Sequence, residues 1–178
     1  MERRLFVAGV CAALAGGAGC TIRQSDAAKT GSTTTARPLS AYDCPPHDRH
    51  AEPIVCSHTV DTDSASVYLL PSASTADAAT GVELTLHNDS ASALEFNPYQ
   101  WSVVQQDGAA WTPVEKRIAG DGRVVLDPGE TQTWTFADVV GFINDRFLID
   151  PGTYTASIGV PNPDGDDWLR CLALFRLT

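Results

Sequence analysis

The sequence has little lysine, and it lacks the motifs that mark the commonest enzyme classes. Lys29 and Lys116 are its 2 lysines, and 22 acidic residues against 12 basic ones give a net charge of −10. Such a surface repels phosphate groups, so the composition argues against a nucleic-acid partner. A nucleophile motif of the form G-x-S-x-G is missing, and so is a glycine-rich phosphate loop. We therefore predict a protein that is not an enzyme and needs no cofactor.

Long apolar runs are missing as well. The longest, residues 5–18, has 14 residues, whereas a membrane-spanning helix needs about 20. The run has the length of a signal peptide's apolar region and follows a positive start at Arg3 and Arg4. Its beginning, "RRLFV", resembles a twin-arginine export signal, and its end, "GAGC", resembles a lipobox, which is cut before a cysteine that receives lipid. The resemblance implies removal of residues 1–19 and a lipid anchor on Cys20.

One position departs from the lipobox pattern, because Gly17 stands where lipoproteins usually have leucine. A plain signal peptide cut near Ala18, with Cys20 left free, is the alternative. An exposed thiol is unfavourable in an exported protein, so we favour lipidation. Two acyl chains, as lipoproteins carry, give a stable anchor. We predict a location on the extracellular side of the cell membrane, with the membrane as a partner through the N-terminal lipid.

The mature chain divides into three parts by composition. Residues 20–41 are rich in Thr, Ser and Ala and have almost no large apolar side chain, which predicts a flexible, disordered stalk. Residues 42–59 contain two cysteines and three histidines, and residues 60–178 alternate short apolar runs with turn residues. We expect a disulfide-closed segment over 42–59 and one folded domain over 60–178.

The segment "CPPHDRHAEPIVCSH" allows two interpretations. A disulfide between Cys44 and Cys56 would close a loop of about a dozen residues and stabilise the fold by about 3 kcal/mol. An oxidising compartment outside the cell favours this bond. Cys44, His47, His50 and Cys56 could instead bind zinc or copper, but their spacing matches no structural zinc pattern. We therefore predict the disulfide rather than a metal site.

Short strands dominate the predicted domain. The expected strands, separated by turns rich in Asp, Asn, Pro and Gly, are 66–70, 82–88, 101–106, 124–126, 131–136, 153–160 and 168–177. Apolar and polar residues alternate over 82–86, and His87 is expected on the solvated face rather than as a general base. No segment has a long helical period. Strands at this spacing predict an all-β protein, a sandwich or barrel.

Two features favour the immunoglobulin-like β-sandwich. "DPGTY" resembles the tyrosine corner of that fold, in which the hydroxyl of Tyr154 would bond back to the chain. Trp101 follows the second strand where the fold places its buried tryptophan. Ala156 stands where antibody domains have a cysteine, so we expect no disulfide between the sheets. Cys171 is then expected to be a buried free thiol, and a bond to a cysteine of 42–59 is the alternative.

The stretch "LHNDSASALEFNPYQWSVVQQDGAAWTPV", followed by "LDPGETQTWTF", is similar to immunoglobulin-like domains of archaeal and bacterial exported lipoproteins. More distantly, it is similar to the bacterial domain named as an intracellular proteinase inhibitor. The resemblance covers residues 82–137 and implies the fold. Together with the export signal and the acidic, lysine-poor composition, it suggests a haloarchaeal, halophilic lipoprotein. An ordinary acidic secreted protein is the alternative.

Several other residues are expected to be structural. Four side chains of "NPDGDDW" carry oxygen atoms that suit calcium: Asn162, Asp164, Asp166 and Asp167. The same residues are those that a hairpin turn needs, and the glycine at the sixth position of a calcium loop is missing, so we predict a turn. Trp111 and Trp134 are expected in the core rather than in a carbohydrate platform.

These observations predict a lipid-anchored, non-catalytic module that binds a protein or envelope component through its loops or an open sheet edge. Two alternatives remain. The first is a protease inhibitor that uses an exposed loop at 138–150, whose apolar content exceeds what a turn needs. The second is a metal-handling surface lipoprotein that uses the cysteines and histidines of 42–59.

Overall fold

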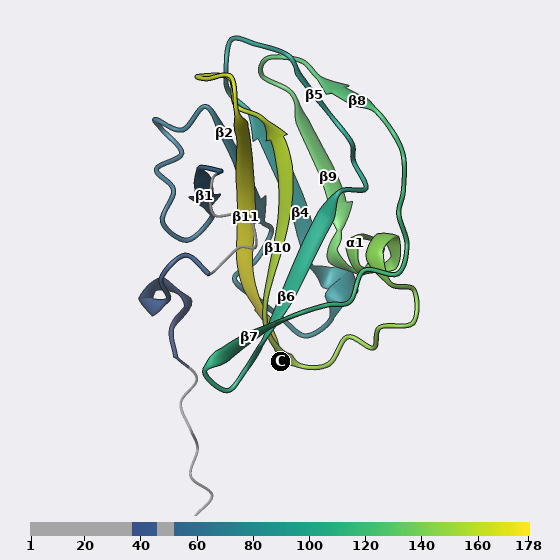
Figure 1. Ribbon diagram of the computed structural model, residues 1–178. Helices are drawn as coiled ribbons and strands as arrows, with labels where there is room; N and C mark the ends of the chain where they lie inside the picture. Colours follow the sequence, from purple (N-terminus) through teal and green to yellow (C-terminus); the bar gives the residue numbers. More distant parts are fainter. Residues whose placement is uncertain (1–36, 46–51) are drawn as a thin grey trace, which may run out of the picture. The chain divides into compact units, whose positions relative to one another are not determined.

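The computed structural model of the chain describes residues 37–45 and 52–178 (Figure 1). The described residues belong to one compact unit, Ala36–Thr178. The predicted sites Arg3, Arg4, Cys20, His47 and His50 lie outside the described residues. No described helix is long and apolar enough to cross a membrane.

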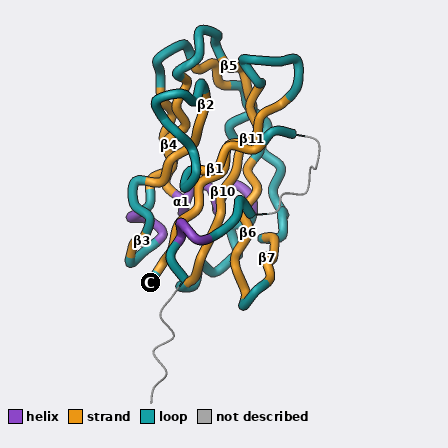
Figure 2. The backbone as a smooth tube through the Cα atoms, turned by 90° about the vertical axis from the view of Figure 1, so that its left-hand side faces the viewer, coloured by secondary structure: helices purple, strands orange, loops and turns teal. Residues whose placement is uncertain are grey.

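The folded unit is an all-β sandwich with one short α-helix, so the predicted fold class is confirmed (Figures 1 and 2). The larger sheet has the strand order β1 (Ile54–Cys56), β11 (Trp168–Leu177), β10 (Gly152–Pro161), β6 (Trp101–Asp107) and β7 (Ala110–Pro113), and β3 (Thr75–Ala76) also pairs with β11. β1 and β3 run parallel to β11, and the other neighbours in this sheet are antiparallel.

The second layer is smaller. It has the antiparallel order β2 (Val67–Pro71), β4 (Glu83–Asn88) and β9 (Thr131–Thr135). The order β2-β4-β9, facing β11-β10-β6, corresponds to the A-B-E and G-F-C strands of the immunoglobulin fold. β5 (Leu94–Phe96) and β8 (Val124–Leu126) form a separate antiparallel pair. Two short 3-10 turns, η1 (Leu39–Ala41) and η2 (Ala79–Gly81), complete the elements outside the helix.

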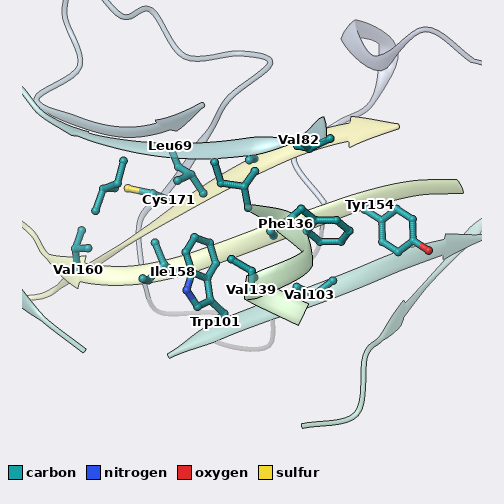
Figure 3. Close-up of a cluster of buried hydrophobic side chains, with 14 of the residues drawn as sticks. Leu69, Val82, Trp101, Val103, Phe136, Val139, Tyr154, Ile158, Val160 and Cys171 are labelled. Carbon is teal, nitrogen blue, oxygen red and sulfur yellow. The ribbon is translucent and has the colours of Figure 1, made fainter. Parts of the chain in front are cut away.

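The core lies between the two layers (Figure 3). Leu69 from β2 and Trp101 from β6 meet Ile158 from β10 there, and each is at most 2% exposed. In β4 the predicted alternation holds, because Leu84 and Leu86 are fully buried while Glu83, Thr85 and His87 are more exposed. Period-2 burial of this kind places one face of each strand against the opposite sheet.

The features that favoured the immunoglobulin-like sandwich are present. The hydroxyl of Tyr154 donates to the backbone carbonyl of Asp150 over 2.7 Å, which is the expected tyrosine corner. Trp101 is 2% exposed, and its indole N–H donates to the Pro98 carbonyl over 2.9 Å. Cys171 is a fully buried free thiol, as predicted.

The predicted exposed loop 138–150 is wrong over its first half. Residues Phe136–Ile143 form α1, which buries four apolar side chains: Phe136, Val139, Val140 and Ile143. Thr135 caps this helix, because its hydroxyl oxygen accepts from the backbone N–H of Asp138 over 3.1 Å. The spacing of the buried residues, 136, 139, 140 and 143, is the helical period. The exposed loop is therefore confined to the residues after α1.

The 114–123 loop connects β7 to β8 and packs closely over Tyr99. The side-chain amide of Asn97 donates to the Gly120 carbonyl over 3.2 Å, and its carbonyl accepts from the backbone N–H of Tyr99 over 3.0 Å. A Cβ atom on Gly120 would lie 2.5 Å from the Cβ of Tyr99, and one on Gly122 would lie 2.7 Å from its ring. Only glycine fits at these two positions.

The 37–45 segment covers the face of β11 that points away from the main core. β10 and β11 are buried on both faces, unlike β4. Tyr42 and Cys56 form a second apolar cluster there with Leu172 and Leu174 of β11. Residues 37–41 were expected in the stalk, but here they lie against the domain, and the guanidinium of Arg176 donates to the Arg37 carbonyl over 2.7 Å. This arrangement positions the candidate site.

Candidate binding pocket

A pocket opens between the 37–45 segment and the β6–β7 hairpin, at the open edge of the larger sheet. Its volume is about 460 Å³, which falls in the range of ligand sites in proteins. It is lined by Arg37, Tyr42, Asp43, Cys44, Pro45, Gln106, Gly108, Ala109 and Trp111. The pocket thus joins residues of the expected stalk and disulfide segment to residues of the domain.

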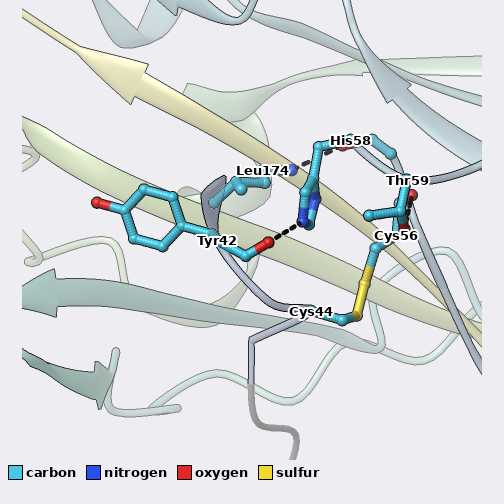
Figure 4. Close-up of a disulfide and its surroundings, with 7 residues drawn as sticks. Tyr42, Cys44, Cys56, His58, Thr59 and Leu174 are labelled. Carbon is cyan, nitrogen blue, oxygen red and sulfur yellow. Dashed lines mark hydrogen bonds between the residues drawn. A yellow bond between two sulfur atoms is a disulfide. The ribbon is translucent and has the colours of Figure 1, made fainter. Parts of the chain in front are cut away.

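The predicted disulfide fixes one wall of this pocket (Figure 4). Cys44 and Cys56 are bonded, with their Cα atoms 6.0 Å apart, so the prediction is confirmed. The ring of His58 lies beside the bond, and its Nε2 makes a 3.0 Å hydrogen bond to the Tyr42 carbonyl. A carbonyl only accepts, so Nε2 carries the proton of a neutral His58. Within the described residues, the buried Nδ1 of His58 has no hydrogen-bond partner.

Tyr42 is the central side chain of the pocket wall. Tyr42 is 8% exposed. The Arg37 guanidinium lies 4.5 Å from its ring centroid, and the Trp111 ring centroid is 6.0 Å away at an angle of 65°. The Tyr42 hydroxyl donates to Oε1 of Gln106 over 2.7 Å. These contacts fix the orientation of two aromatic rings and one cation at the pocket.

The pocket lining offers polar groups that the fold does not use. In the described part of the chain, the Gln106 amide nitrogen, the Trp111 indole N–H and the Asp43 carboxylate take part in no hydrogen bond. The Arg37 side chain donates to the Ala41 carbonyl, which leaves further N–H groups of the guanidinium available. The lining therefore presents several donors and one charged acceptor around an aromatic wall.

The hairpin tip keeps the mouth of the pocket open. Gly108 has a φ of +59°, a conformation that favours glycine, and the turn between Asp107 and Ala110 needs it. No atom lies within 4 Å of a Cβ added at Gly108. Because Gly108 and Ala109 carry almost no side chain, the partly buried Trp111 behind them remains accessible from the mouth.

The other predicted candidates have structural roles. The 162–167 turn is closed by its own side chains, since the Asn162 amide donates to Oδ1 of Asp167 over 2.7 Å and Oδ1 of Asn162 accepts from the backbone N–H of Asp164 over 3.1 Å. Among residues 37–45 and 52–178, no group of three or more His, Cys, Asp or Glu is placed to hold a metal ion. The sulfur atoms of Cys44 and Cys56 are bonded to each other, so they cannot act as thiolate ligands in this form.

The predicted positions of two tryptophans and one histidine are refined by the structure. Trp134 packs against the core and contacts Trp101, with the ring centroids 5.0 Å apart. Trp111 packs on the second cluster and also lines the pocket. His87 is half-buried rather than fully solvated, because its ring stacks on Tyr68 at 4.7 Å.

Among residues 37–45 and 52–178, three groups have shifted pKa values, and all three lie outside the pocket. A hydrogen bond to Asp89, with burial, raises the pKa of Tyr68 to about 12. Burial raises the pKa of the Cys171 thiol to about 12. Burial and the Asp150 carboxylate raise the pKa of Tyr154. Each shift favours the neutral side chain, which suits structural roles in a folded core.

Sequence reasoning did not find the pocket. Arg37 was assigned to the stalk, and Trp111 to the core. Tyr42 and Gln106 are 64 positions apart in the sequence, and no motif joins them. The signal that could have helped is the isolated tyrosine two residues before Cys44, since a disulfide would hold it against the domain.

Comparisons with known proteins leave the family open. No protein-family model matches the chain, and no curated protein matches it. Among solved structures, the chain is similar to a mutant β-glucosidase from Listeria innocua in complex with laminaribiose, at 22% identity over 63% of this chain and 16% of that chain, with a TM-score of 0.25. The match to the same organism's β-glucosidase in complex with glucose has 22% identity over 60% of this chain and 16% of that chain, also at 0.25. Likeness at this level carries no argument about function.

Proposed function

We propose that the chain is a lipid-anchored extracellular lipoprotein whose sandwich is a non-catalytic binding module. The observation that supports it best is the pocket at the β6–β7 edge, lined by polar groups that no described residue satisfies. The Gln106 amide and the Trp111 indole are half-buried, where polar groups are normally paired, and the Asp43 carboxylate is exposed beside them, so the hollow offers free hydrogen-bonding groups to a ligand. The sequences "RRLFV" and "GAGC" support export and lipidation at Cys20.

The pocket lining favours binding over catalysis. Its one cysteine, Cys44, is bonded to Cys56, and the lining contains no serine or histidine that could form a nucleophile–base pair. Gln106, Trp111 and Tyr42 are side chains that bind and orient rather than react. The disulfide holds the 37–45 segment against the sheet, which would keep the pocket formed outside the cell.

The test has two parts, the localisation of the protein and its binding to isolated cell envelopes. Wild-type protein should fractionate with membranes and carry a lipid mass on its N-terminal peptide, whereas Cys20→Ser should appear in the medium. Purified Cys20→Ser protein should then bind isolated cell envelopes, and Trp111→Ala in that background should not. Trp168→Ala is the matched control, because Trp168 is 46% exposed and absent from the pocket lining.

Two results would contradict the proposal. A wild-type N-terminal peptide without lipid would remove the anchor. Envelope binding that Trp111→Ala leaves intact, or that Trp168→Ala reduces equally, would remove the pocket from the binding role.

One observation favours protease inhibition as a second candidate function. Leu148, in the loop after α1, is 80% exposed, while its neighbours Phe147 and Ile149 pack against the core. The loop is braced by the Asn144 amide, which donates to the Glu115 carbonyl over 3.1 Å. A fixed loop that presents one apolar side chain suits a protease specificity pocket.

This candidate is tested with subtilisin and chymotrypsin. The Cys20→Ser protein should slow cleavage of a peptide substrate, and Leu148→Asp should remove that effect. Val125→Asp is the control, because Val125 is also exposed, at 51%, but lies on β8. Full protease activity at a large excess of the Cys20→Ser protein, whose loop is unchanged, would exclude the inhibitor function.

A further inference from the structure

We propose that the pocket between the 37–45 segment and the β6–β7 hairpin binds a neutral carbohydrate ring. The inference rests on the proposed binding function and names its ligand class. The pocket's volume of about 460 Å³ accommodates one or two sugar rings, since ligand sites of about 300–1,000 Å³ hold molecules of that size and larger.

The polar groups of the lining fit a ligand with many hydroxyls. A hydroxyl donates one hydrogen bond and accepts up to two, so a sugar ring needs donors and acceptors side by side. The amide nitrogen of Gln106, the indole N–H of Trp111 and the free N–H groups of Arg37 are donors. The Asp43 carboxylate is the acceptor. Within the described chain none of these groups has another partner.

The aromatic wall fits the other surface of a sugar. A pyranose ring has a face of C–H groups, which packs against an aromatic ring. Trp111 is partly buried and contacts Tyr42 edge-on at 65°, which fixes the indole at the pocket wall. The small residues Gly108 and Ala109 at the hairpin tip leave room for a ring to approach Trp111.

Charge favours a neutral ligand over an ionic one. The one cation of the lining, Arg37, stacks over Tyr42 and shares the pocket with the Asp43 carboxylate. The whole chain has a net charge of −10, which repels anions such as phosphate esters. A cationic ligand would meet the Arg37 guanidinium. A polyol meets neither penalty, and it uses both charged side chains as hydrogen-bond partners.

The experiment titrates the purified Cys20→Ser protein with glucose, mannose, galactose and N-acetylglucosamine, followed by saturation-transfer NMR and calorimetry. We expect at least one of them to bind with a Kd on the order of 1 mM, as is typical for a ligand with few atoms. Trp111→Ala should raise that Kd about tenfold or more, and Trp168→Ala should leave it unchanged.

A second variant guards against misfolding. Asp43 is exposed and makes no hydrogen bond within the described residues, so Asp43→Ala should fold normally and still weaken sugar binding about fivefold. Sugars that do not bind below about 50 mM would overturn the carbohydrate assignment. Equal binding by wild type and both pocket variants would also overturn it.

Failure of this inference differs from failure of the proposed function. If the protein binds envelopes through Trp111 but none of the four sugars, the binding module stands and the ligand class is wrong. If it binds neither envelopes nor sugars, the binding function itself is wrong.

Discussion

Two irregular segments lie across the sheets of this sandwich, and they are held in different ways. The 114–123 loop packs so closely on Tyr99 that its glycines leave no room for a methyl group. The 37–45 segment is instead held at separate points, by the disulfide, by the His58–Tyr42 hydrogen bond and by Arg176. The pocket lies beside the segment that is attached at separate points, and the 114–123 loop contributes no residue to its lining.

The disulfide should give the largest effect. Replacing both residues, Cys44→Ala with Cys56→Ala, should lower the free energy of unfolding by about 3 kcal/mol, because the bond closes a loop with a sequence separation of 12. Thermal melts of the Cys20→Ser protein and this variant measure the loss. Alanine avoids placing a hydroxyl at Cys56, which is 3% exposed.

Reduction provides the control for that variant. A reducing agent should lower the melting temperature of the parent protein to that of the double variant and leave the double variant unchanged. Ligand binding in the pocket should weaken both in the reduced parent protein and in the double variant. A double variant as stable as its parent would show that the polar contacts alone hold the 37–45 segment.

The glycine loop should respond next. Gly120→Ala should destabilise the fold by about 1–3 kcal/mol, because a Cβ there would lie 2.5 Å from the Cβ of Tyr99 and force the loop to shift. Gly141→Ala is the matched control, since Gly141 lies in α1 with no atom within 4 Å of its added Cβ. That change should stabilise the helix by about 0.5–1 kcal/mol.

Urea unfolding of the two glycine variants gives the free energies. Pocket binding should be unchanged in both, because the 114–123 loop does not line the pocket. Gly120→Ala with wild-type stability would mean that the loop is loosely packed and that the contrast between the two segments is wrong.

The two tyrosines sharpen the comparison further. Tyr42→Phe should cost about 1 kcal/mol, because it removes the 2.7 Å hydrogen bond to Gln106. Tyr99→Phe should cost close to nothing, since the Tyr99 hydroxyl has no hydrogen-bond partner in the part of the chain that the structure describes. Paired urea denaturation curves compare the two. Equal losses of unfolding free energy in the two variants would mean that the tyrosine hydroxyl contributes no more to holding the 37–45 segment than to holding the 114–123 loop.

Much of the sandwich could be predicted from the sequence, because its strands are short apolar runs bounded by turn residues. β8 and β11 have the predicted bounds, and β4, β6 and β9 differ by one residue at one end. The helix α1 was missed because "FADVVGFI" is rich in aromatic and β-branched residues, which also suit a strand. Its helical period becomes visible only once Thr135 is recognised as a cap.

The site could not be predicted in the same way. β1 and β7 are short edge strands whose partners are set by the fold, not by local pattern. The pocket depends on both, because β1 carries Cys56 and β7 carries Trp111. The disulfide was predictable from composition and compartment, but where it places Tyr42 was not. Residues brought together only by strand pairing leave no signal in a single sequence.

Cys171 provides the finest test, because it lies on β11, whose outer face the 37–45 segment covers, but belongs to the core on the other face. It pairs in register with Val55 of β1, one residue before Cys56. Burial raises the pKa of its thiol to about 12, from an ordinary value of 9.0. The neutral thiol is therefore favoured in the folded state. This contribution to stability is complete below pH 9 and is lost as the pH rises towards 12.

At pH 8, iodoacetamide should label the exposed Cys44 of the reduced, folded protein faster than the buried Cys56 and leave Cys171 unmodified, since thiolate is the reactive form and burial keeps the Cys171 thiol neutral. Denaturant should expose all three to labelling, which peptide mass spectrometry can follow. Raising the pH to 10 should speed the labelling of Cys171 far less than unfolding does. If Cys171 reacted as fast as Cys44 after reduction alone, releasing the 37–45 segment would also be opening the sheet at β1. The segment would then be part of the core rather than a cover attached to it at separate points.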